Sequence, residues 1–146
     1  MARLESQFPE LASELQQASV EKLRAACVAA CEYAVAQAQI EHALVMDALG
    51  RLRAGEDITE KRKELENLVE QLDEEYFDLA DAFAEGRASM SDYQKPFAKA
   101  RAVALLLYAF DPNPCDAASE AIYEAHAVTD EDDPGKLIPA IMAILK

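Results

Sequence analysis

Apolar residues recur every three or four positions over residues 57–85, a spacing that predicts an amphipathic helix. Asp57-Ile58-Thr59-Glu60 has the spacing of a capping box and predicts its start, and Gly86 predicts its end. We therefore expect a long helix with a single apolar side. That side comprises Leu65, Leu68, Val69, Leu72, Tyr76, Leu79, Ala80 and Phe83.

The most apolar stretch is AVALLLYAF, at residues 102–110. A helix that is apolar all round is normally buried, so this stretch predicts the central helix of the fold, over residues 97–110. Two start points fit the sequence: a capping box at Ser91–Gln94, or Pro96, since proline is tolerated in the first turn of a helix. The side chains expected to be nearly fully buried are Leu106, Leu107 and Phe110.

Proline, serine and glycine divide the first third of the chain. Pro9 predicts the start of a short helix with Leu11 and Leu15 on its apolar side. Ser19 predicts the N-cap of a helical segment over residues 20–53. As one straight helix this segment would be about 51 Å long, whereas a compact chain of this length is about 38 Å across. We therefore expect it to bend, to break near residues 37–42, or to end by Gly50, with Gly55 as a C-terminal stop.

Two further helices are predicted after the apolar stretch. Asn113 has the character of an N-cap and Pro114 of a first helical residue, for a helix that runs to about Val128. Asp133 with Pro134 predicts the start of the last segment, and Pro139 either kinks that segment or restarts it. Its apolar side comprises Leu137, Ile141 and Leu145.

The fold class follows from this pattern together with the composition. No period-two strand pattern is visible, Trp is absent, and 29 of the 146 residues are Ala, the best helix former. A chain of this length is most simply one domain. We predict an all-α protein, a single helical domain over residues 1–146 with five to seven helices around the central one.

The formal net charge of −14 limits the kinds of partner that this chain is expected to bind. Such a chain repels nucleic-acid phosphates and anionic membrane surfaces, and it attracts basic proteins. Residues 1–10 lack the apolar core of a signal peptide, and the apolar run at 102–110 is about half the length that spans a bilayer. Three cysteines in apolar settings, Cys27, Cys31 and Cys115, are typical of reduced core residues. The expectation is a cytoplasmic protein that binds neither nucleic acid nor membrane.

The excess negative charge lies in two stretches. Residues 56–85 carry twelve acids and three bases, and residues 111–133 carry eight acids and no Lys or Arg. The remaining residues have a net charge of +3, because −14 less −9 and −8 leaves +3. Within residues 70–86, seven of seventeen positions are acidic and none is basic.

On helical geometry these acids form two rows. The first row lies opposite the apolar side of the 57–85 helix and comprises Glu70, Glu74, Asp78, Asp81 and Glu85. The second lies on the 114–128 helix and comprises Asp116, Glu120 and Glu124, with Ala118, Ala121, Ile122 and Ala125 expected to face inward. Like charges one turn apart destabilise a helix. We expect both rows either to be solvated faces that aid solubility or to bind a protein partner.

No complete catalytic or metal-ligating set is visible. Cys27 and Cys31 lie one turn apart without a second Cys/His pair to complete a zinc site, and no Glu-x-x-His motif of di-iron bundles occurs. Of the two histidines, we expect His42 at the core or its rim and His126 at the end of its helix. No nucleophile motif or phosphate-binding glycine loop is present. We therefore expect a non-enzymatic protein that needs no cofactor or metal.

One enzymatic alternative comes from the spacing of Asp73, Asp78 and Asp81. Helical enzymes that process nucleotides or isoprenoids bind Mg²⁺ through such carboxylates, but they also need a facing acidic motif. Residues 20–53 offer only unpaired acids, namely Glu21, Glu32, Glu41 and Asp47. A helical adaptor or structural protein is a second alternative.

Residues 25–128 resemble the small all-helical immunity proteins of bacterial toxin systems. The resemblance rests on Cys31-Glu32-Tyr33, on ALGRLRAGED, on the charged helix, and on ARAVALLLYAFDPNPCDAASEAIYEA. It implies a bacterial protein without enzymatic activity that neutralises a toxin by direct binding. A basic toxin domain as partner agrees with the charge argument, since an acidic inhibitor is steered quickly to a basic toxin. In a variant of the same idea, the carboxylate rows stand in for nucleic-acid phosphates.

Overall fold

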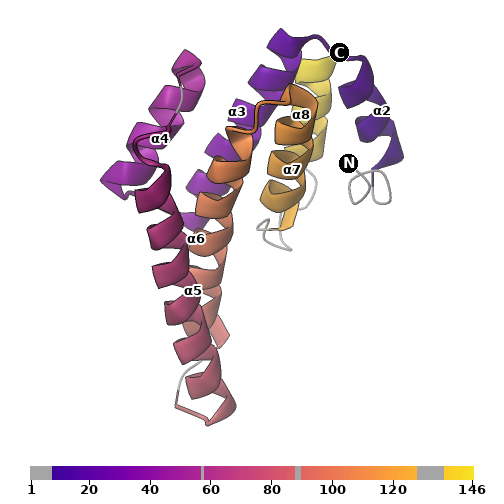
Figure 1. The fold of residues 1–146 in the computed structure, drawn as a ribbon. Coiled ribbons are helices and arrows are strands. Elements are labelled where there is room, and N and C mark those ends of the chain that lie inside the picture. The colour runs from indigo at the N-terminus through magenta and orange to yellow at the C-terminus, as the bar shows by residue number, and fades with distance from the viewer. Residues whose placement is uncertain (1–7, 57, 88–89, 128–136) are drawn as a thin grey trace.

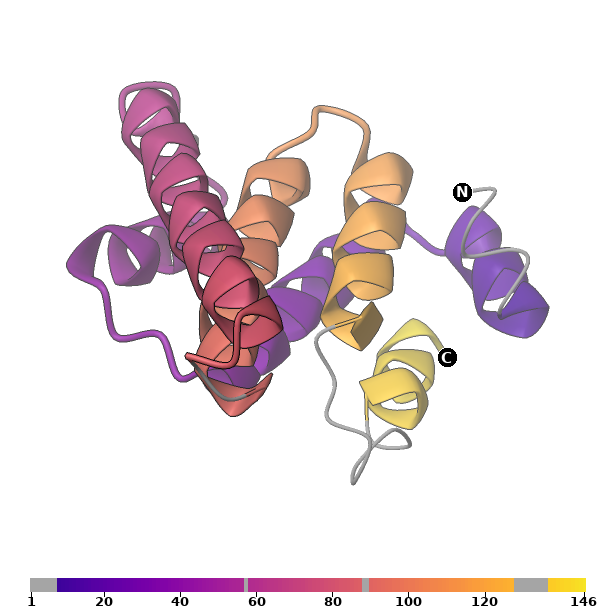
Figure 2. The ribbon, with the colours of Figure 1, turned by 90° about the horizontal axis from the view of Figure 1, so that it is seen from below.

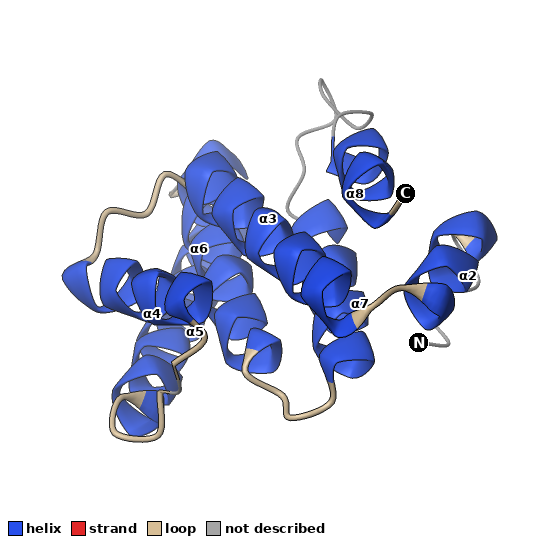
Figure 3. Ribbon diagram, turned by 90° about the horizontal axis from the view of Figure 1, so that it is seen from above, coloured by secondary structure: helices blue, strands red, loops and turns tan. Residues whose placement is uncertain are grey.

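The computed structural model describes residues 8–56, 58–87, 90–127 and 137–146. These residues form seven α-helices and no strand, which confirms the predicted all-α class (Figures 1 and 3). The helices are α2 (Pro9–Gln17), α3 (Val20–Ala38), α4 (Ala43–Ala54), α5 (Arg62–Ala84), α6 (Met90–Ala109), α7 (Pro114–Ala127) and α8 (Leu137–Leu145).

Three helices, α3, α6 and α7, pack against one another at the centre of the molecule. Helices α2 and α8 cover them on one side and α4 covers them on the other, as Figures 1 and 2 show. The predicted role of the 97–110 segment as the one central helix is therefore only partly correct. Helix α3 contacts α4, α6, α7 and α8, so it shares that position with α6.

Alanine lets the central helices approach closely. In α3, Ala26, Ala30 and Ala34 are fully buried at four-residue steps, and α7 contributes buried Ala118 and Ala121 from the facing side. Small side chains allow two backbones to pack at short range, so the alanine content that predicted helices also builds the centre of the core.

Helix α5 packs on α6, and the two extend well past the other helices (Figure 1). We call the α5–α6 pair the arm. Leu65 is the one residue of α5 that is fully buried, while Leu68 and Leu72 are partly buried against the core. Farther along α5 the predicted apolar side is only half covered, and Phe83 is 40% exposed. The arm is therefore a two-helix element with an incompletely buried apolar side.

The local signals at the first helix ends are confirmed. The Ser19 side chain accepts a hydrogen bond from the Lys22 backbone N–H at 3.2 Å and so caps α3. The segment over residues 20–53 breaks at residues 39–42, where Gln39 adopts the left-handed conformation with φ 56°. Gly55 ends α4 with φ 76°, in the region that favours glycine.

The predicted starts of α5 and α6 are wrong. Helix α5 begins at Arg62, later than predicted. A turn comes first, in which the backbone N–H groups of Lys61 and Arg62 both donate to the Ile58 carbonyl at 2.8 Å. Ile58 is 1% exposed, so tertiary burial holds this turn in place. Asp57, the expected cap, lies outside the described residues. Helix α6 begins at Met90, ahead of both the Ser91–Gln94 box and Pro96.

The last two helices follow the sequence closely. The Asn113 side chain accepts hydrogen bonds from the N–H groups of Cys115 and Asp116, at 3.0 and 3.1 Å, and so caps α7 as predicted. Helix α8 runs through Pro139, which lies in its first turn. Its apolar side is buried as expected, with Leu137, Ile141 and Leu145 at most 3% exposed. The predicted start at Asp133 and Pro134 lies outside the described residues.

The burial predicted for α6 is correct at Leu106 only. Leu106 is fully buried, whereas Leu107 and Phe110 are partly buried at the edge of the core. Tyr108 is 45% exposed. An all-apolar stretch does not reveal which side faces inward, and α6 keeps one side partly open.

Candidate functional site

The outer side of α5 carries the first acidic row. Glu70, Glu74, Asp78 and Asp81 are exposed, and none of them has a hydrogen-bond or ion-pair partner among the described residues. Four-residue steps drift around a helix by about 40° each and three-residue steps drift back by about 60°. The row mixes both steps, so it stays on one side. We call these four residues the open row.

Glu85, the last predicted member of this row, is exposed but paired. The Arg87 Nε donates to its Oε2 at 2.7 Å, and the two side chains form an ion pair. Arg87 follows the end of α5 and lies outside the acidic stretch in sequence, but its side chain points back to Glu85. Glu85 is therefore paired within the chain and is left out of the open row.

The second row is not a surface row. Asp116 is exposed, Glu120 is half-buried, and Glu124 is only 4% exposed. Glu124 instead lies 3.6 Å from a guanidinium nitrogen of Arg101 on α6. Both steps in this row are four residues long, so the positions drift by about 80° in total, toward the packed side of α7. The expectation that Glu124 lies on the same exposed face as Asp116 is wrong. The predicted inward residues Ala118, Ala121, Ile122 and Ala125 are fully buried.

An exposed aromatic cluster lies beside the open row. The Tyr76 ring contacts Phe77 on α5 and Phe97 on α6, each with centroids 5.3 Å apart. Phe77 is 61% exposed and Phe97 is 40% exposed. We call Tyr76, Phe77 and Phe97 the aromatic cluster. It joins the two helices of the arm and continues onto the acidic side.

Phe77 was not predicted as a site residue. It interrupts the helical spacing of the apolar side and falls among acidic positions, and that mismatch was the available signal. On a helix its neighbours are the residues three and four positions away, which include Asp73, Glu74 and Asp81. Phe77 is thus an exposed ring bordered by carboxylates.

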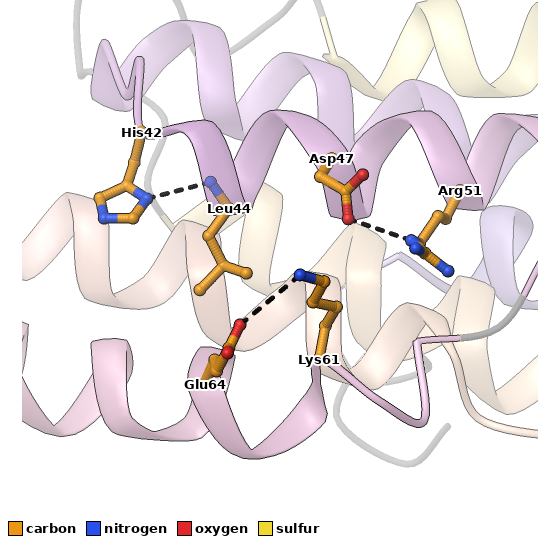
Figure 4. A network of polar contacts seen from close by, with 6 residues as sticks. All are labelled: His42, Leu44, Asp47, Arg51, Lys61 and Glu64. Atoms are coloured by element: carbon orange, nitrogen blue, oxygen red, sulfur yellow. Dashed lines mark hydrogen bonds and ion pairs between the residues drawn. The ribbon is translucent and has the colours of Figure 1, made fainter.

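One other part of the surface pairs its acids with bases. At the corner of α4 and α5, Asp47 accepts a hydrogen bond from Arg51 at 3.0 Å, and Lys61 lies 3.9 Å from Glu64 (Figure 4). The hydrogen bond and charge of Asp47 raise the pKa of Arg51. These local pairs neutralise that corner, whereas the open row is left without cations.

The histidines have structural positions. His42 was expected in the core or at its rim, but it is exposed, and its Nδ1 accepts the Leu44 N–H at 3.1 Å as the cap of α4 (Figure 4). His126 lies in the last turn of α7, as predicted, with its ring edge-to-face against Phe8 at 4.9 Å. The helical conformation ends at Ala38 and resumes at Ala43, so His42 precedes α4 as its cap and is not held at the core by a continuous helix.

Cys27 and Cys31 are buried free thiols in α3, as expected, and Cys115 is a half-buried free thiol. Burial raises the pKa of the Cys31 thiol well above its usual range, and its contact with Cys27 adds to the effect. Cys31 therefore stays protonated and packs as a small apolar side chain. Cys27 lines a hollow of about 210 Å³ whose charged lining residues are Arg24 and Glu56.

The described ranges contain no group of three or more His, Cys, Asp or Glu side chains placed to hold a metal ion. Of the acids that suggested magnesium binding, Asp78 and Asp81 point outward from α5 and Asp73 is half-buried. A search of the same part of the chain finds no helix both long and apolar enough to cross a membrane.

Comparison with protein-family models, with curated proteins and with solved structures found no significant match. Architecture and surface therefore define the class of this protein. It is an all-α protein with a projecting two-helix arm, whose outer side carries unpaired carboxylates next to exposed aromatic rings.

Proposed function

We propose that this is a non-catalytic binding protein that inhibits a basic protein by covering its functional surface. The role matches that of the small all-helical immunity proteins that its sequence resembles, whose partners are bacterial toxins. The observation that carries the proposal is the open row, four exposed carboxylates on a projecting helix without partners in the described structure.

The open row works against the stability of its own helix. Glu70, Glu74 and Asp78 follow at four-residue steps, and each like-charged pair costs a few tenths of a kcal/mol. An intramolecular role would supply cations, as the α4–α5 corner does with Arg51 and Lys61. An intermolecular role explains their absence, because a partner's Lys and Arg then complete the pairs.

The expected effect of such a row is mainly kinetic. Exposed ion pairs add little affinity each, but a field of one sign steers an oppositely charged protein and speeds association. Its position on the arm makes the row accessible to a partner (Figure 1). An inhibitor that must intercept a toxin before it acts gains most from fast association.

The test compares two double variants with the same change of charge. Glu74→Lys/Asp78→Lys removes half of the open row, and Glu41→Lys/Glu56→Lys changes two exposed acids outside the helices. Wild type and variants are used to capture partners from native cells, and association rates are then measured at several salt concentrations. The open-row variant should associate about tenfold more slowly at low salt and with a flatter salt dependence.

The control variant should stay close to wild type, and the captured partner should be basic and lose its toxicity when the wild-type protein is co-expressed. Equal rates for both variants would reject the open row as the binding surface. A captured partner that is acidic, or one whose activity is unaffected by binding, would reject the inhibitor role.

A further inference from the structure

We infer that the aromatic cluster is the anchor of the interface and that its occupant is a basic amphipathic segment of the partner, with an apolar side chain over Phe77 and Lys or Arg around it. This inference rests on the proposed function and adds the chemistry of the partner's surface. The observation behind it is the joint position of exposed rings and unpaired carboxylates on the arm.

The cluster has the properties of an interface centre. Binding energy is concentrated in a few central residues, aromatic ones prominent among them, inside a polar rim. Phe77, at 61%, is the most exposed of the large apolar side chains in the described structure. Tyr76 and Phe97 extend the apolar area from Phe77 to the second helix of the arm. Two helices alone do not cover this area, and a third segment laid on it would.

The charges one turn from Phe77 decide which segment fits. Any group that covers Phe77 also comes within reach of Asp73, Glu74 and Asp81, which lie one turn away on either side. A neutral or acidic partner would desolvate these carboxylates without compensation. A basic segment pairs with them, and its Lys and Arg stems add apolar contact.

A second copy of this chain is a poorer occupant. A two-fold interface centred on Phe77 would bring the same surface of both copies together. Residues 56–85 carry a net charge of −9 in each copy, so two such segments would repel. The repulsion is greatest near the open row, beside the rings that would need to meet.

The two parts of the surface then have different kinetic roles. The open row acts at a distance and sets the association rate, whereas the desolvated cluster holds the complex and sets the dissociation rate. Truncation of a ring should therefore accelerate dissociation with little effect on association, which is the reverse of the charge variant.

The test uses two synthetic peptides of about 18 residues, long enough to form a helix. One has Leu and Lys in an amphipathic helical pattern, and the other is oligolysine. Their affinities for wild type, Phe77→Ala, Phe77→Tyr and Tyr108→Ala are measured by fluorescence anisotropy. Tyr108→Ala is the matched control, because it truncates an exposed aromatic side chain outside the cluster. Circular dichroism verifies that each variant is folded.

The Leu/Lys peptide should bind wild type at least about tenfold more tightly than oligolysine does. Phe77→Ala should remove that advantage and leave oligolysine binding unchanged, while Phe77→Tyr and Tyr108→Ala should retain it. If Phe77→Ala binds the Leu/Lys peptide as wild type does, the anchor is rejected and the proposed function stands. If neither peptide binds wild type, both the anchor and the proposed function, which needs a surface that binds basic chains, are rejected. Sedimentation that shows a dimer abolished by Phe77→Ala would assign the cluster to a second copy and overturn the inference.

Discussion

Leu106 and Leu107 are adjacent in the most apolar stretch of the chain, but α6 places them in different surroundings. Leu106 is fully buried, and Leu107 is half-buried at the edge of the core. Leu106→Ala should lower the free energy of unfolding by about 2–5 kcal/mol, the range for a truncated core leucine. Leu107→Ala should cost about 1 kcal/mol, since a half-buried side chain loses roughly half the apolar contact area.

Urea denaturation of the two variants measures this difference directly. Both substitutions remove the same atoms from neighbouring positions of one helix, so helix propensity cancels between them. Equal losses of stability, or a larger loss for Leu107→Ala, would contradict the orientation of α6 in the core.

At the scale of the helix, one glycine inside α4 and one just after it should respond in opposite ways to substitution by alanine. Gly50 lies inside the helix, and Gly55 follows its end with φ 76°. No atom lies within 4 Å of a Cβ added at either position. Gly50→Ala should therefore stabilise the protein by about 0.5–1 kcal/mol through helix propensity. Gly55→Ala should destabilise it by about 1–2 kcal/mol, because the left-handed backbone is unfavourable for alanine.

Thermal unfolding of both variants should give shifts of opposite sign. Because neither added methyl group meets other atoms, packing cannot account for such a difference. Destabilisation by Gly50→Ala would mean that a methyl group at position 50 meets other atoms, and a neutral Gly55→Ala would mean that the turn after α4 adapts.

Helix ends with a local cause could be predicted from the sequence. Ser19 and Asn113 cap their helices through their own side chains, and the spacing of polar and apolar residues contains that information. The start of α5 could not be predicted in this way. It depends on the burial of Ile58 in the hydrophobic core, which capping rules do not represent.

The candidate surface shows the same division. The exposure of Glu70, Glu74, Asp78 and Asp81 follows from helical spacing within α5. The four-residue steps of the second row indicate that Glu124 turns toward the packed side of α7, but its ion pair with Arg101 depends on another helix. The aromatic cluster could not be predicted without knowing that α5 packs on α6, because Tyr76 and Phe97 are distant in sequence and contact each other only in the folded structure.

At the scale of the whole molecule, the net charge of −14 should make stability depend on salt. Screening lengths fall from about 30 Å at 0.01 M to about 8 Å at 0.15 M ionic strength. Self-repulsion opposes the compact state, so the unfolding midpoint should rise by roughly 2–4 °C between these concentrations, corresponding to about 1 kcal/mol for a chain of this size. Differential scanning fluorimetry measures this change.

The two charge-reversal variants separate net charge from its arrangement. Glu74→Lys/Asp78→Lys and Glu41→Lys/Glu56→Lys both change the net charge from −14 by +4 to −10. Only the first also turns the repulsion of Glu70 with residue 74, and of residue 78 with Asp81, into attraction, a gain of a few tenths of a kcal/mol per pair, while residues 74 and 78 remain a like-charged pair. At low salt it should have the higher unfolding midpoint of the two, and the gap should narrow at 0.15 M. Identical midpoints at all salt concentrations would mean that the open row costs its helix nothing, which would remove the energetic reason for assigning it to a partner. A midpoint that falls with salt in the wild type would show that attractive pairs such as Arg101 with Glu124 outweigh repulsion in the molecule as a whole.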